Sequence, residues 1–72
     1  MPEAQPSATE WVAAFAHLVG AEPPTPAEVE TLLELAAIAA HSSERFAAPL
    51  ACWLAGRTGK TLAEALELAR RA

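Results

Sequence analysis

The stretch that decides the fold is TPAEVETLLELAAIAAH, residues 25–41, because it carries a complete set of helix signals. Thr25 stands where an N-cap residue belongs, Pro26 suits the first helical position, and Glu28 suits the third. Apolar residues then recur at helical spacing: Val29, Leu32, Leu33, Leu35, Ala36, Ile38 and Ala40. This wide apolar stripe predicts a helix over residues 26–41 that is the most buried helix of the chain.

A shorter helix is predicted upstream, over residues 8–19. Ser7 and Glu10 have the spacing of a capping box, and Gly20 stands where a C-terminal glycine would end the helix. Apolar residues lie between these signals at the spacing of one helix face: Trp11, Val12, Phe15, Leu18 and Val19. Residues 1–7 are predicted to form a disordered lead-in.

Two further helices are predicted downstream. Pro49 disfavours a helical conformation at the residue before it, so we expect the third helix to begin at this proline and to cover residues 49–56. Thr61 and Glu64 have the spacing of another capping box, which predicts a fourth helix over residues 62–71.

The composition agrees with a single all-α domain over residues 8–72, arranged as a compact four-helix unit. Ala, Leu and Glu, which favour helices, dominate the 72 residues. A core of this size contributes only about 3–5 kcal/mol, so short chains usually need further support. Because one cysteine permits no internal disulfide, and 53% of the residues are hydrophobic, we expect that support from helix packing and self-association.

Charge and hydropathy argue against several classes of function. Five Lys and Arg stand against nine acidic residues, a net charge of −4, whereas nucleic-acid binding requires a basic face. The apolar runs are shorter than the about 20 residues that span a membrane, and no signal peptide is apparent. One free cysteine without an export signal favours the cytoplasm. Because Cys52, His17 and His41 are scattered, we expect no metal site and no cofactor.

The string GRTGKT, residues 56–61, ends like a phosphate-binding loop. The full pattern G-x-x-x-x-G-K-T requires glycine at the position of Leu54, and it requires a preceding buried strand. We therefore interpret the string as a link between two helices, in which the glycines end one helix and Thr61 caps the next. A weak anion site beside Arg57 and Lys60 is the alternative interpretation.

The polar segment HSSERFAAP, residues 41–49, interrupts two apolar helices and is the first place to look for a site. His41 could act as an acid or base near neutral pH, and Ser43 could act as a nucleophile beside an oriented base. No group beyond Glu44 completes such an arrangement, so the sequence favours a non-catalytic role and an enzyme using His41 is the weaker alternative. The purely structural interpretation is that His41 and Arg45 stabilise the C-terminal end of the helix while Glu44 pairs with an arginine. The candidate ligand-binding residues are His41, Glu44, Arg45, Pro49, Arg57 and Lys60.

The aromatic residues are expected in the core rather than on a stacking platform: Trp11, Phe15, Phe46 and Trp53. An exposed aromatic side chain would instead mark a partner surface, because aromatic residues concentrate at interfaces. Cys52 lies in an apolar run and is expected to be a small buried hydrophobic residue.

The acidic helical form is similar to that of acyl and peptidyl carrier proteins. Those proteins carry an Asp-Ser-Leu attachment motif at the start of the second long helix. Here that helix starts with TPAE, residues 25–28, and the chain contains no aspartate. A carrier function is therefore not favoured.

Residues 35–56 read LA..AAH..ER.AAPL..WLAG and resemble a small uncharacterised bacterial domain. With the tryptophan-containing first helix, the resemblance spans most of residues 8–70. Phe46 stands where the family has a proline, which affects the expected turn shape. In that family the domain occurs alone or appended to molybdenum cofactor guanylyltransferase-like proteins. The resemblance implies an accessory role beside enzymes that transfer cofactors or nucleotides, without an established activity.

The sequence thus predicts a protein-interaction or assembly module whose partner is another protein or the chain itself, as a homo-oligomer. This prediction rests on the apolar excess and on the lack of a catalytic constellation. The alternative is an accessory domain in molybdenum cofactor metabolism that binds an anionic nucleotide- or pterin-like ligand through Arg45, Arg57 and Lys60.

Overall fold

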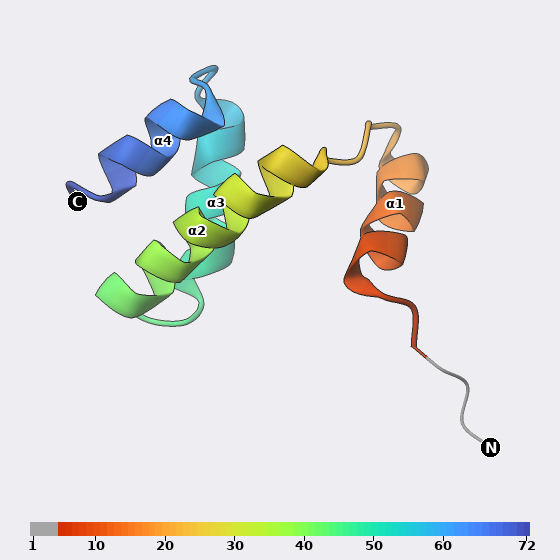
Figure 1. The fold of residues 1–72 in the computed structure, drawn as a ribbon, viewed down its shortest axis with the longest axis horizontal. Coiled ribbons are helices and arrows are strands. Elements are labelled where there is room, and N and C mark those ends of the chain that lie inside the picture. Colours follow the sequence, from red (N-terminus) through yellow and green to blue (C-terminus); the bar gives the residue numbers. More distant parts are fainter. Residues whose placement is uncertain (1–4) are drawn as a thin grey trace.

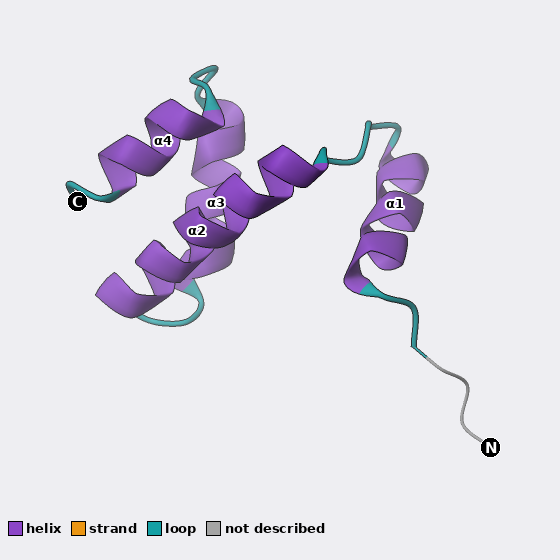
Figure 2. Ribbon diagram, in the orientation of Figure 1, coloured by secondary structure: helices purple, strands orange, loops and turns teal. Residues whose placement is uncertain are grey.

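A computed structural model describes residues 5–72, and this part of the chain folds into four α-helices without a strand (Figures 1 and 2). The helices are α1 (Ala8–Val19), α2 (Pro26–Ser42), α3 (Ala47–Arg57) and α4 (Leu62–Ala69). The predicted all-α four-helix domain is confirmed. Of the lead-in expected over residues 1–7, residues 1–4 lie outside the described part.

Three of the helices begin at the capping boxes that their sequences contain. In each box the side-chain oxygen of the N-cap residue accepts a hydrogen bond from the third helical N–H, and the glutamate carboxylate accepts one from the N-cap N–H. The pairs are Ser7 with Glu10, Thr25 with Glu28, and Thr61 with Glu64. Gly20 ends α1 in the left-handed conformation, with φ of 76°.

The start of α3 differs from the prediction by two residues. The helix begins at Ala47, so Pro49 occupies the third helical position rather than the first. The first N–H groups of a helix have no partner within it, and a proline is therefore tolerated throughout the first turn. Phe46 is the N-cap and supplies no side-chain hydrogen bond.

α2 is the central helix of the packed part of the molecule, because both α3 and α4 pack against it. The core is the cluster of Leu35 on α2, Ala55 on α3 and Leu66 on α4. Smaller or partly buried side chains surround this cluster: Ile38, Ala51, Cys52, Leu62, Ala65 and Ala69. Cys52 is thus partly buried, as a small hydrophobic residue at the edge of the core, and burial raises the pKa of its thiol.

α1 stands to one side of this three-helix unit, beyond the proline-containing connection of residues 20–25 (Figure 1). Among the described residues, α1 makes no packing contact comparable with those of α2 against α3 and α4. The molecule consequently measures 46 × 26 × 18 Å along its principal axes.

The expectation that the aromatic side chains form the core is wrong. Trp11, Phe15, Phe46 and Trp53 are between 50% and 67% exposed. Trp11 and Phe15 lie on α1, against which none of the other described helices packs closely, and Phe46 lies in the α2–α3 connection. Trp53 is two residues away from the core-facing Ala51 and Ala55, which places it on the opposite side of α3.

Membrane crossing requires a helix of sufficient length and apolarity. Within the described residues, none of the helices meets both conditions.

Candidate functional site

The six predicted site residues are all exposed and lie at the two connections that flank α3. His41 lies in the last turn of α2. Glu44 and Arg45 lie in the α2–α3 connection, and Pro49 lies in the first turn of α3. Arg57 is the last residue of α3, and Lys60 lies in the α3–α4 connection.

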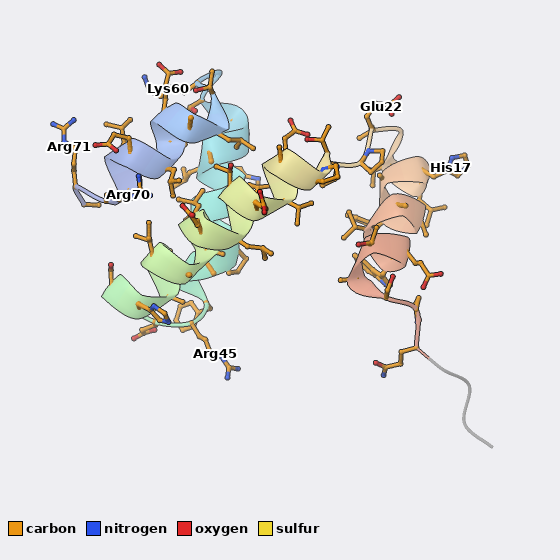
Figure 3. All side chains as sticks on the ribbon, in the orientation of Figure 1. His17, Glu22, Arg45, Lys60, Arg70 and Arg71 are labelled. Carbon is orange, nitrogen blue, oxygen red and sulfur yellow. The ribbon has the colours of Figure 1, made fainter. Side chains whose placement is uncertain are left out.

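The structure does not gather these residues into one site. α3 has 11 residues, which separates its two ends by about 16 Å. Figure 3 shows Arg45 and Lys60 at opposite ends of this helix. A small ligand would therefore contact either Arg45 or Lys60 in one chain.

The α2–α3 connection is held by its backbone. The carbonyl oxygens of Glu44 and Arg45 accept hydrogen bonds from Ala47 and Ala48, at 2.9 and 3.2 Å. Within the described part of the chain, Glu44 forms no ion pair with an arginine, unlike the interpretation offered from sequence. These contacts form a turn that leads into α3.

The GRTGKT string is a link between two helices, as predicted. It follows α3 rather than a strand, Gly59 adopts φ of 73°, and Thr61 caps α4. The Thr58 hydroxyl donates to the Ala55 carbonyl and accepts from the Lys60 N–H, both at 3.3 Å. The hydrogen bond from the Thr61 N–H lowers the pKa of the Glu64 carboxyl below its ordinary value. This pKa shift therefore comes from the helix cap.

Within residues 5–72, no group of three His, Cys, Asp or Glu side chains lies close enough to hold a metal ion.

Arg57, one of the candidate ligand-binding residues, contacts an aromatic side chain of its own helix. Its guanidinium lies over the Trp53 ring at 4.6 Å from the ring centroid.

The main concavity of the three-helix unit is an apolar groove of about 640 Å³ between α2, α3 and α4. Its walls are the leucine, isoleucine and alanine side chains of the three helices, principally Leu35, Ile38, Leu50, Leu54 and Leu68. Three of the lining residues are exposed to solvent because the groove is open: Leu50, Leu54 and Leu68. Four polar residues also line it: Ser42, Ser43, Thr58 and Lys60. The chemistry of this lining suits apolar groups.

The second apolar surface is the α1 stripe, which consists of Trp11, Val12, Phe15, Leu18 and Val19. Every member of the stripe is exposed, and Leu18 reaches 81%. The Trp11 and Phe15 rings stack with centroids 5.2 Å apart and an angle of 23° between their planes. The stripe therefore presents a preformed aromatic surface to its surroundings.

The sequence predicted the α1 stripe as the apolar face of a helix, but its aromatic residues were expected in the core. The signal that could have identified α1 as unpartnered is the pair Pro23-Pro24, because consecutive prolines keep a connection extended. No sequence signal could have shown the groove, which depends on how α2, α3 and α4 pack.

Comparison with known proteins gives one match. No curated protein and no solved structure matches the chain. The family model described as a domain of unknown function (DUF6457) matches residues 3–72, and the chain therefore belongs to this family.

Proposed function

We propose that this domain is a self-associating assembly module, which acts by burying apolar surface against further copies of the chain rather than by catalysis. The observation that carries the proposal is the exposure of large apolar side chains. Twelve of them are exposed within the described residues, in the α1 stripe, along the groove and at Val29, Leu33, Phe46 and Trp53.

The exposed area supports this proposal quantitatively. The chain has an accessible surface of 6018 Å² at a mass of 7.5 kDa. A folded monomer of that mass usually exposes about 4,200 Å², so roughly 1,800 Å² is in excess. A specific protein interface buries about 800 Å² on each partner. One chain therefore has enough surplus surface for a complete interface.

The small interior of the chain supports the proposal independently. Only Ala16, Leu35, Ala55 and Leu66 are buried among the described residues, and no large side chain there is fully buried. A small core supplies about 3–5 kcal/mol, and association adds stability that rises with the logarithm of the protein concentration once this exceeds the dissociation constant. Self-association would thus supply the additional stability that an internal disulfide gives to other small domains.

Light scattering after size-exclusion chromatography tests the proposal. We expect a mass above the 7.5 kDa of one chain. That mass should fall on dilution, with loading varied from about 1 mM to about 1 µM to cover weak and strong association. A mass of one chain at every concentration would overturn the proposal.

A second candidate is an accessory role in molybdenum cofactor metabolism, with an anionic nucleotide- or pterin-like ligand. It is supported by the resemblance of residues 35–56 and by exposed cations that form no ion pair within the described part: Arg45, Arg57 and Lys60. Because Arg45 and Lys60 lie at opposite ends of α3, this candidate places the anion at one connection only. Thermal shift with guanosine triphosphate and with a pterin tests it: stabilisation that Arg45→Ala or Lys60→Ala removes supports it, and no stabilisation refutes it.

A further inference from the structure

We infer that two copies of this chain exchange their first helices, so that the α1 stripe of each copy lies in the apolar groove of the other. This inference rests on the proposed self-association and adds the surfaces, the partner segment and the symmetry. The result is a dimer in which each copy gives one helix and receives one.

The two surfaces have matching character. The α1 stripe contains no charged residue, and its apolar positions form one continuous face of the helix. The groove is lined mostly by aliphatic side chains from three helices, with four polar residues among sixteen lining residues. An amphipathic helix placed in an apolar groove is a recurrent mode of protein recognition.

The number of surfaces also matches. Each copy has one α1 stripe and one groove between α2, α3 and α4, so two copies related by a two-fold axis cover both stripes and both grooves. A stripe that bound elsewhere would leave the groove open to water. Exchange therefore predicts a closed dimer and not a filament.

The connection between α1 and α2 favours a groove on another copy. Residues 20–25 join α1 to Pro26, the first residue of α2, whereas the groove begins at Leu35 and includes Ile38. The distance along α2 from Pro26 to Ile38 is about 18 Å. Pro23 and Pro24 stiffen the connection, and α1 stands apart from the unit of α2, α3 and α4 (Figure 1). Exchange of an identical element between two copies is a low-cost route to a dimer.

The surplus surface of each chain is large enough for a standard interface. The surplus of roughly 1,800 Å² on each chain exceeds the about 800 Å² per partner of a standard interface. A single patch of this chain pressed against the same patch of a second copy would cover either the stripe or the groove. Exchange covers both.

Three variants test the exchange by complementation. Phe15→Glu places a charge in the stripe, and Leu54→Glu places one in the groove. Both wild-type side chains are at least half exposed in one chain, so neither substitution disturbs the core of the monomer. Ala13→Glu is the matched control, because Ala13 is exposed and lies across α1 from the stripe. Circular dichroism verifies that each variant retains its helices.

We expect Phe15→Glu and Leu54→Glu to weaken dimerisation by a factor of about 100 or more, because each buries an unpaired carboxylate. Ala13→Glu should dimerise like the unaltered chain. A mixture of Phe15→Glu and Leu54→Glu should regain a dimer with one copy of each, which native mass spectrometry resolves by mass. In that dimer an intact stripe meets an intact groove once.

The outcomes separate this inference from the proposed function. Suppose that the unaltered chain is a dimer. If the Phe15→Glu variant is also a dimer, or if the mixture of the two variants stays monomeric, the exchange is refuted while self-association stands. If the unaltered chain is a monomer at every concentration, self-association itself is refuted. Should a glutamate variant lose its helices, Phe15→Ala and Leu54→Ala allow the same complementation with a smaller loss of affinity.

Discussion

α1 and α4 have the same local design and different surroundings. Each begins with a capping box, at Ser7 and at Thr61, and each has one apolar face. Leu66 of α4 is buried against α2, whereas Phe15 of α1 is half exposed. The comparison shows that capping and periodicity determine where a helix forms, and that the connection and the available partner surface determine what it packs against.

The largest effect is expected in the packed unit, at its most buried side chain. Leu35→Ala should lower the free energy of unfolding by about 2–5 kcal/mol, because it leaves a cavity between α2, α3 and α4. Urea denaturation followed by circular dichroism measures the change. Leu33→Ala is the control, since Leu33 lies on the exposed side of the same helix. Equal losses from the two variants would contradict the assignment of the core.

The corresponding substitution in α1 should act through association. Phe15→Ala is expected to remove about 1.5–3 kcal/mol at concentrations where the unaltered chain is dimeric, and little where it is monomeric. Urea denaturation at two protein concentrations separates these cases. A loss that does not depend on concentration would show that Phe15 packs within its own chain.

These two substitutions show what could be predicted from sequence. The helices were predictable because their start signals are local, as at Ser7, Thr25 and Thr61. The exposure of Trp11 and Trp53 was not, because an apolar stripe has the same periodicity whether its partner is in the same chain or another. For the candidate site, the sequence identified exposed residues, but their separation to the two ends of α3 depends on the length of that helix.

The capping boxes allow a smaller and more specific comparison. Thr61→Ala should lower the free energy of unfolding by about 1 kcal/mol, because α4 forms part of the core. Ser7→Ala removes the same hydrogen bond from α1 and should increase amide hydrogen exchange in α1 alone at low protein concentration. Increased exchange throughout α2, α3 and α4 in Ser7→Ala would contradict the independence of α1.

Acid should weaken the Thr61–Glu64 cap, and of the changes considered this should alter the free energy of unfolding least. Hydrogen bonds from Thr61 hold the pKa of the Glu64 carboxyl below its ordinary value of 4.5. The folded chain therefore binds this proton more weakly than the unfolded chain, so the contribution to stability is complete above pH 4.5 and is lost as the pH falls through the lowered value. Glu64→Gln should flatten this part of the stability profile between pH 6 and 3, roughly. An unchanged profile would show that the cap does not contribute.

The exchange of α1 is tested most directly by nuclear Overhauser effects in a mixture of isotope-labelled and unlabelled chains, filtered to detect only contacts between different copies. We predict contacts from the Trp11 ring protons to the Leu54 methyl groups across two chains. Trp11 lies in the α1 stripe and Leu54 lines the groove. If Trp11 and Leu54 are in contact only within one chain, or if no contact between copies reaches the groove, the exchange is contradicted.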